Sequence, residues 1–578
     1  MKYLNFKSEY NRSPKVKIND YEEGIYNSYS TIYGRISKAL KQDSTLVFEC
    51  YPGVRYKELE TELFSRFKDA EIIFVDDFAK TGEEITEMID DKLSNDRVFA
   101  FISYYDILDF YHPEKVLEIQ QKETNKLQIF YGFGASKIVS NAVVTYCDMP
   151  RWEIQQRYRT HEMTNWRMDT FDLDILRKYK RSYFFEWRTA DMIKKNIFEN
   201  IDFYIDTTKK KLPKMITGID FRDALKQTAK TPFRLVPYFD PGVWGGQWMK
   251  EVCNLDKTKE NYAWSFDGVP EENSLYLAFG KQYLESPSIN IVFYQPKELL
   301  GDKVYKKFGK EYPIRFDLLD TIKGGNLSLQ VHPLKSYIKE QFNIDYTQDE
   351  SYYMLEAFGD AVVYLGVKEG IDKNELLEDL RKAERGEKLF DDDKFINQFK
   401  AKKHDHFLIP AGTIHCSGKN CMVLEISATP YIFTFKLWDW GRLGMDGLPR
   451  PVHIDHGEQV IQFDRDTTWV KTNLVDQVKI LEKEKDLLVE KTGLHELQFI
   501  ETLRYTISKE ITINTNESVN QLNLVDGKKI IVSSINDEFE DFIVNYAETF
   551  IVPEQIKQYK IRPFTKGQEV MILRASIK

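Results

Sequence analysis

Two of the nine histidines in this chain lie in sequence contexts that suit a metal ion. His332 ends an apolar, strand-like run, and Gln330 lies two residues before it, so that both side chains project to the same face of an extended strand. His415 follows a Pro-Ala-Gly-Thr turn and precedes another apolar run. Glu350 lies between the two histidines, at the start of a third strand-like run. These four residues are the candidate metal ligands.

One amide oxygen, two imidazoles and one carboxylate are ligand types that zinc accepts. Glu350 would be the one anionic ligand, so a bound Zn²⁺ would keep a net positive charge. Such an ion polarises a bound oxygen and stabilises a developing oxyanion, whereas a thiolate-rich site would cancel the charge. The residue types therefore indicate a catalytic rather than a structural metal site.

A packed or solvent-exposed side chain is the more common role of a single histidine on a strand, and it is the alternative to metal binding here. His404 and His406 flank Asp405 and compete as ligands, because alternate residues of a strand share a face. We interpret both histidines mainly as loop residues.

The elements around the candidate ligands are mostly β-strands. Helical periodicity predicts one insert at 372–385, which opens with Asp372 and Glu375 at the spacing of a capping box. Many short strands separated by turns favour a β-barrel or a sandwich. The same pattern of short strands and turns continues through 468–578, a stretch that contains almost no histidine. The predicted strands of the ligand-bearing region are at 326–331, 361–367, 407–410, 421–427 and 431–438.

Residues 1–228 have a different pattern, in which apolar strands alternate with amphipathic helices such as 57–68. This alternation predicts an α/β domain with a mostly parallel sheet. A polar stretch that ends in Pro232 marks the boundary, which gives three domains at 1–228, 229–467 and 468–578. The predicted strands of the first domain are at 45–50, 71–75, 98–102, 127–131 and 142–147, with a helix from Arg151 onward.

Bulk composition excludes several classes of protein. A chain of 578 residues is too long for one hydrophobic core. Its 81 basic and 91 acidic residues give no global attraction to nucleic acid or to an anionic membrane. Five scattered cysteines indicate a reducing compartment. We find neither a signal peptide nor an apolar run of spanning length, which predicts a cytoplasmic protein.

Several segments in one order resemble the class I mannose-6-phosphate isomerases, which have a cupin (double-stranded β-helix) fold. The likeness covers about 232–465 and continues weakly to 578, as a second, degenerate cupin. Each motif alone is weak, but the ordered series is specific. The matching segments are Trp244-Gly245-Gly246, Gln330-Val331-His332-Pro333, Glu350, residues 409–415, Trp438-Asp439-Trp440-Gly441-Arg442 and Val452-His453-Ile454-Asp455.

The resemblance implies an isomerase that interconverts mannose 6-phosphate and fructose 6-phosphate through a cis-enediol, with one zinc ion per cupin site. It implies a small-molecule sugar phosphate as partner, no nucleic acid and no membrane, and it leaves a homodimer open. Glu350 would be occupied by metal, so His453 and Asp349 are the candidate bases. By resemblance, the metal ligands are Gln330, His332, Glu350 and His415, the catalytic and substrate-binding arginine is Arg442, and Lys335 is a second substrate-binding residue.

The chain departs from the family at Gln348, where a lysine is common two residues before the glutamate ligand. Glutamine carries no charge and cannot transfer a proton at neutral pH. Gly441 likewise replaces an acidic residue of the family. The alternative function is therefore a non-catalytic or altered-specificity, sugar-phosphate-binding regulatory protein.

The first domain faintly resembles a nucleoside-kinase-like P-loop fold, with residues 51–58 where a phosphate loop would lie. Phosphate cradling needs several glycines and a Lys-Ser/Thr pair, but here Gly53 stands alone and Glu58 would repel phosphate. Gly132 and Gly134 are interpreted as turn glycines. We therefore predict a degenerate kinase-like domain. An active phosphotransferase is the less favoured reading.

Overall fold

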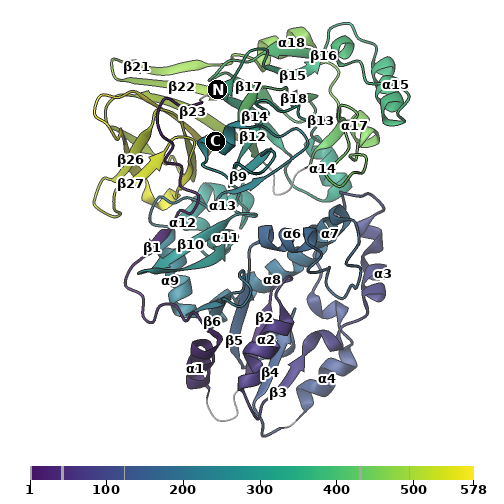
Figure 1. Ribbon diagram of the computed structural model, residues 1–578, viewed down its shortest axis with the longest axis vertical. Helices are drawn as coiled ribbons and strands as arrows, with labels where there is room; N and C mark the ends of the chain where they lie inside the picture. The colour runs from purple at the N-terminus through teal and green to yellow at the C-terminus, as the bar shows by residue number, and fades with distance from the viewer. Residues whose placement is uncertain (1–2, 41–44, 123, 429–432, 494) are drawn as a thin grey trace.

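The computed structural model describes the chain except for residues 1–2, 41–44, 123, 429–432 and 494. An α/β part, built from the N-terminal residues, lies below a β-rich part in Figure 1. The two parts share one continuous hydrophobic core, and a smaller core lies within the C-terminal strands.

The N-terminal part is built on a six-stranded sheet with the order β3-β4-β2-β5-β6-β7. Its first five strands are parallel, and β7 pairs antiparallel with β6. The predicted α/β domain with a mostly parallel sheet is therefore confirmed. The strands are β2 (Thr45–Cys50), β3 (Glu71–Phe74), β4 (Gln128–Gly132), β5 (Val143–Asp148), β6 (Phe203–Asp206) and β7 (Lys214–Thr217).

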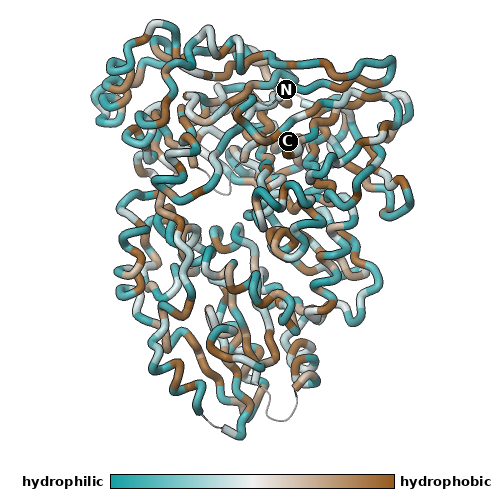
Figure 2. The backbone as a smooth tube through the Cα atoms, turned by 180° about the vertical axis from the view of Figure 1, so that it is seen from behind, coloured by the Kyte–Doolittle hydropathy of each residue, from teal (hydrophilic) through white to brown (hydrophobic). Residues whose placement is uncertain are grey.

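Helices lie around this sheet, and hydrophobic residues follow its strands in Figure 2. Pro150 is at the N-cap of α6, a helix with three aromatic or aliphatic, four charged and two amide side chains. The helices are α1 (Tyr29–Ala39), α2 (Tyr56–Glu62), α3 (Gly82–Leu93), α4 (Pro113–Gln121), α5 (Ala135–Ile138), α6 (Arg151–Arg159), α7 (Ile175–Arg181), α8 (Trp187–Ile197) and α9 (Gly218–Thr228).

The predicted strand at 98–102 is wrong, because this segment is irregular and packs against the β-rich part. The Phe99 ring lies 5.3 Å from the Phe435 ring, and Ile102 N donates to the carbonyl of Phe342. Its apolar residues thus bury themselves between two parts of the molecule rather than in a sheet.

Strands β12 to β19 have the order of a jelly roll, in which two antiparallel sheets face each other. One sheet has the order β17-β14-β19-β12-β9-β8, and the other has β16-β15-β18-β13-β20. We call this unit the first barrel; it confirms the predicted β-barrel or sandwich. Its strands are β8 (Tyr238–Asp240), β9 (Trp264–Gly268), β12 (Arg315–Asp320), β13 (Leu329–Val331), β14 (Asp349–Ala357), β15 (Val362–Val367), β16 (Ile396–Lys400), β17 (His406–Ile409), β18 (His415–Ser417), β19 (Cys421–Ala428) and β20 (Phe435–Trp438).

Helices pack on one side of the first barrel (Figure 1). The predicted insert forms α15, and the Asp372 side chain caps it by accepting the backbone N–H of Glu375. The predicted strand at 431–438 begins at Phe435; residues 431 and 432 lie outside the described chain. The helices are α14 (Lys335–Phe342), α15 (Lys373–Glu384), α16 (Asp392–Phe395), α17 (Ile454–Val460) and α18 (Thr467–Asn473).

Strands β23 to β30 repeat the same order, with sheets β21-β22-β23-β30-β25-β28 and β24-β29-β26-β27. We call this unit the second barrel. The strands are β21 (Lys479–Glu484), β22 (Leu487–Gly493), β23 (Ile500–Ile507), β24 (Ile511–Asn514), β25 (Asn520–Asp526), β26 (Lys529–Ser534), β27 (Phe542–Asn545), β28 (Thr549–Val552), β29 (Gln558–Pro563) and β30 (Val570–Ile577).

A connecting region joins the three units, and the start of the chain belongs to it. Strand β1 (Val16–Ile18) pairs in parallel with β10 (Ser274–Phe279), which pairs with β11 (Gln282–Pro287). Before β1, Asn11 N donates to Glu548 of the second barrel, at 2.7 Å. The domain boundaries at 228/229 and 467/468 stay predictions. The helices of this region are α10 (Trp248–Val252), α11 (Ile289–Tyr294), α12 (Pro296–Leu300) and α13 (Asp302–Phe308).

All five cysteines are buried free thiols. Across the described part of the chain, every helix is too short or too polar to cross a membrane.

Candidate metal centre and its cavity

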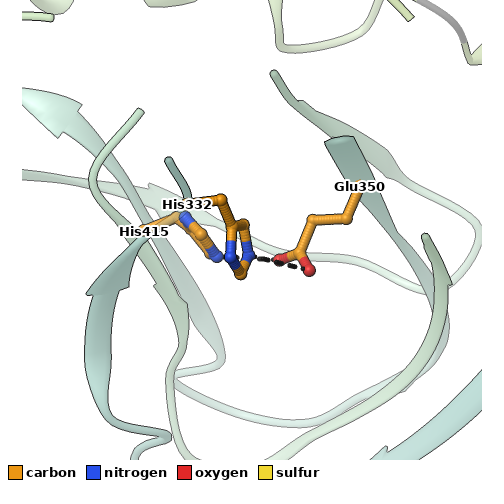
Figure 3. Close-up of side chains that lie close together, drawn as sticks. All are labelled: His332, Glu350 and His415. Carbon is orange, nitrogen blue, oxygen red and sulfur yellow. Dashed lines mark ion pairs between the residues drawn. The ribbon is translucent and has the colours of Figure 1, made fainter. Parts of the chain in front are cut away.

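His332, Glu350 and His415 converge inside the first barrel, and their side chains point toward one another in Figure 3. His415 begins β18, and His332 directly follows β13 in the same sheet. Glu350 comes from β14 in the facing sheet. The jelly roll therefore brings residues that are far apart in sequence to one point between its two sheets.

The distances are short enough for one ion to bridge the cluster. The Glu350 carboxylate lies with Oε2 3.0 Å from His332 Nε2 and with Oε1 2.7 Å from His415 Nε2. One ligand atom from each residue can be chosen so that all lie within 4.8 Å of one another. The three side chains have no exposed surface.

Backbone carbonyls orient both imidazoles. His332 Nδ1 lies 2.8 Å from the Phe433 carbonyl, and His415 Nδ1 lies 2.9 Å from the Thr413 carbonyl. A carbonyl only accepts, so each Nδ1 donates its proton to a carbonyl and each Nε2 faces the cluster, where a bound metal would replace any proton on it. This second shell is typical of histidines that bind a metal.

A bound cation would neutralise the buried Glu350 carboxylate and give the unpaired nitrogen and oxygen atoms of the cluster a partner. His332 Nε2 and Glu350 Oε1 are buried atoms without a hydrogen bond of good geometry. Burial alone would raise the pKa of Glu350, but the adjacent charges of His332 and His415 hold this pKa far below its usual range. Burial opposes the charge on His332, and the Glu350 carboxylate raises the pKa of His332 above its ordinary value. An ionised carboxylate facing two imidazole nitrogens fits a divalent cation, which would take the place of the protons on those nitrogens.

Two glutamines complete the surroundings of this cluster. Gln330 is the register partner of His415, and its Nε2 lies 3.2 Å from His415 Nε2. A half-turn of this amide would present its oxygen to a metal instead. Gln348 Nε2 donates to Glu350 Oε2 at 3.1 Å, while Gln348 Oε1 accepts the N–H of Phe433. Gln348 therefore orients the Glu350 carboxylate.

Gly412 allows the turn that leads into β18. Its φ of 89° lies in the left-handed region, and an added Cβ would approach the Val460 carbonyl to 2.9 Å. Its N–H donates to the carbonyl of His332, which ties this turn to the other histidine.

A cavity of about 370 Å³ adjoins the cluster through Gln330 and Gln348. Its walls come from the first barrel and from the N-terminal part, so it is shared between the two. Helices α6 and α7 face the barrel at this place in Figure 1. The N-terminal part contributes Val98, Phe99, Trp152, Gln155, Arg159, Ile175, Leu176 and Tyr179. The aromatic and charged residues from the other side are Trp244, Trp264, Phe266, Asp240, Arg315, Asp317, Glu425, Lys436, Arg450 and His453.

Lys436 is a cavity residue that the sequence reasoning missed. It is a register partner of Gln330, so its side chain shares that face of the sheet. Within the described chain, the ammonium has no hydrogen bond or ion pair. Burial, together with the charges of Arg450 and Arg442, lowers the pKa of Lys436 to about 7. A charged residue inside the apolar run of β20 was the signal in the sequence.

Arg442 and Lys335 do not line this cavity. Arg442 Nη2 pairs with Asp439 Oδ1 at 2.5 Å, and Asp439 Oδ2 pairs with Arg450 at 2.8 Å. Arg450, rather than Arg442, faces the cavity. Lys335 begins α14 and is exposed.

The interpretation of His406 as a loop residue is wrong. It begins β17, is buried, and its Nδ1 lies 3.0 Å from Thr492 Oγ1. Burial lowers the pKa of His406 to about 3. His404 does lie in a turn, with φ of 72°, where it contacts Tyr353 and Asp526. Neither histidine belongs to the cluster of candidate ligands.

Fold and site together place the first barrel in the class of jelly-roll proteins that hold a His–Glu cluster beside a cavity lined by apolar, aromatic and charged residues. Several known proteins are similar in sequence to part of this chain. The chain is 27% identical over 232 residues to "Probable mannose-6-phosphate isomerase GmuF" of Bacillus subtilis, which covers 40% of this chain and 68% of that protein. It is 25% identical to "Mannose-6-phosphate isomerase ManA" of the same organism, in a match that covers 40% of this chain and 68% of that protein. The corresponding enzyme of Streptococcus mutans is 25% identical over 39% of this chain and 65% of its own length.

Among solved structures, the mannose 6-phosphate isomerase from Bacillus subtilis matches 60% of this chain and 100% of its own, with 19% identity and a TM-score of 0.49. Residues 28–230 match a family described as "Domain of unknown function (DUF8485)".

Proposed function

We propose that the protein is a zinc-dependent aldose-ketose isomerase that interconverts mannose 6-phosphate and fructose 6-phosphate. The single observation that carries the proposal is the convergence of His332, Glu350 and His415 beside a cavity lined by aromatic and cationic residues. The isomerase names of the relatives, at 25–27% identity, support the same reaction class.

In this proposal Gln330, His332, Glu350 and His415 hold one zinc ion. When bound, the ion supplies Lewis-acid polarisation of the sugar oxygens. The N-terminal aromatic side chains and the barrel tryptophans exclude water from the cavity, which strengthens every charge interaction within it.

Lys436 and Arg450 are the proposed phosphate-binding residues. An anion would offset the cost of burying the Lys436 ammonium beside the Arg450 guanidinium. Arg442 would act indirectly, by holding the Asp439 carboxylate that orients Arg450. Lys335 is the first residue of α14 and lies outside the cavity lining. It could bind the substrate only if this end of α14 moved toward the cavity.

The alternative is a regulatory protein that binds a sugar phosphate without turning it over. Gln348 favours it, since both polar groups of this amide are engaged in hydrogen bonds and neither ionises. For the N-terminal part we propose a kinase-like domain without phosphate-transfer activity. The Glu49 carboxylate accepts the N–H groups of Gly134 and Ser136, so these donors are not available to a phosphate.

The test is a coupled isomerase assay on the full chain before chelation, after chelation and after reconstitution with Zn²⁺. We expect turnover of mannose 6-phosphate that disappears on chelation and returns with the metal. Titration calorimetry with fructose 6-phosphate separates the alternatives. Binding without turnover in the metal-loaded protein would support the regulatory protein and contradict the isomerase.

A further inference from the structure

His453 has an unused nitrogen at the wall of the shared cavity. The residue is at the N-terminal end of α17 and is only 8% exposed. Its Nδ1 is buried without a hydrogen-bond partner among the described residues, and the imidazole lines the cavity. Its backbone N–H donates to the carbonyl of Lys436, which fixes the residue beside β20. The side chain is therefore held in place with one nitrogen free.

The other nitrogen faces a carboxylate from the N-terminal part. Asp96 Oδ2 lies 3.9 Å from His453 Nε2. Asp96 Oδ1 accepts the N–H groups of Val98 and Phe99, at 2.6 Å each, which leaves Oδ2 for the imidazole. The Phe99 ring packs against His453 with 4.7 Å between ring centres. Thus the segment that was wrongly predicted as a strand carries the ring, and Asp96, two residues before that segment, carries the carboxylate.

We infer that His453 is the base that carries the proton in the isomerisation, and that Asp96 is its positioning residue, supplied across the boundary between the two parts. The inference rests on the proposed function. A carboxylate at Nε2 favours the tautomer with its proton there, which leaves the lone pair on Nδ1, a nitrogen buried in the cavity wall. The Asp96–His453 distance is longer than a hydrogen bond; such contacts commonly shorten when substrate binds.

The proton balance follows from the open-chain aldose. His453 Nδ1 accepts the C2 proton, the C2–H electron pair forms the C1–C2 double bond, and the carbonyl electrons move to O1. The imidazolium then returns the proton to C1 while the hydroxyl proton moves from O2 to O1. C2 becomes the carbonyl carbon, and no oxidant or other reactant is needed.

The charged groups around His453 come from several elements. Asp96 lies on the N-terminal segment, Lys436 on β20 and His456 on the same helix. Burial is the largest influence and, with Lys436 and His456, lowers the pKa of His453 to about 4, whereas Asp96 raises it. The imidazole is thus neutral near pH 7, as a base must be.

The decisive variant is His453→Ala in the full-length, zinc-loaded protein. We expect kcat to fall by roughly 10² to 10⁴-fold, with little change in KM and with partial rescue by added imidazole. His404→Ala is the matched control, because His404 contacts Asp526 in a turn outside the cavity lining and should retain wild-type turnover. Unchanged kcat in His453→Ala, or a loss that imidazole cannot restore, would overturn the assignment of the base.

Asp96→Asn tests the positioning residue. Its kcat should fall less than that of His453→Ala, and the acid limb of its pH–kcat/KM profile should move to lower pH, since the carboxylate no longer raises the pKa of His453. Asp91→Asn, on the exposed face of α3, should leave the profile in place.

Histidine-selective ¹³C labelling and NMR titration of His453 give a readout that does not need turnover. A lower His453 pKa in Asp96→Asn than in wild type supports the contact, and an equal pKa contradicts it. A wild-type protein without isomerase activity would defeat the proposed function and the base role together, whereas this titration would still decide the Asp96 contact.

Discussion

The two barrels share one strand order and differ in what fills them. The first encloses Gln330, Glu350 and His415 between its sheets, beside a cavity with further charged groups. The second is packed with apolar side chains from every strand from β23 to β30, among them Leu524, Phe550 and Ile572. The same jelly-roll strand order can therefore either hold a functional site or serve only as a packed structural core. Buried polar groups cost stability, so a barrel that retains them indicates function.

Glu350→Gln should have the largest effect on the first barrel. The variant removes the one anionic ligand of the cluster, so metal affinity should fall by more than about 100-fold, the upper range for losing an outer-shell partner. Metal content by mass spectrometry and isomerase turnover measure the loss. His404→Gln is the matched control, since this histidine lies outside the cluster. Full metal occupancy in Glu350→Gln would remove the distinction between the barrels.

Phe550→Ala should affect the second barrel without affecting the metal. The side chain is completely buried in the apolar core, and its loss should cost about 3 to 5 kcal/mol of local stability. Hydrogen exchange followed by mass spectrometry on peptides from β25 and β30 reports this cost. Ile543→Ala in the same barrel, at a residue 47% exposed, should stay within about 0.5 kcal/mol of wild type. A loss of metal in Phe550→Ala would show that the barrels are not independent.

Asp320→Asn should change the pH dependence of the first barrel. Burial raises the pKa of Asp320 to about 7, against about 3.9 in an unfolded chain. Between these values the folded state binds more protons than the unfolded state, so the unfolding free energy declines as pH rises from about 4 to about 7, by no more than roughly 4 kcal/mol.

Thermal unfolding of the metal-free protein over this pH range should show the decline in wild type and a flatter profile in Asp320→Asn. The exposed residue Asp345 provides the control, and Asp345→Asn should retain the wild-type profile. An unchanged profile in Asp320→Asn would assign the decline to other groups.

The sequence could predict which candidate ligands come together because their motifs occur in one specific order, and the structure brings His332, Glu350 and His415 together. It could not predict the cavity wall, because Phe99 and Trp152 reach the barrel only through contacts between distant parts of the chain. Arg442 was placed at the site from its motif. After β20, however, the backbone turns through Trp440 and Gly441 at positive φ, and the guanidinium pairs with Asp439 instead.

The pairing of the N-terminal segment with the far end of the chain has a consequence for biosynthesis. Asn11 leaves the ribosome long before Glu548, its hydrogen-bond partner in the second barrel. At about 5 to 20 residues per second, this delay is roughly half a minute to two minutes. During that time the parallel sheet can form, but β1 still lacks β10 until Ser274–Phe279 has been made. In nascent chains Val16 and Ile18 would therefore stay without the burial that they have in the folded protein until that stretch emerges.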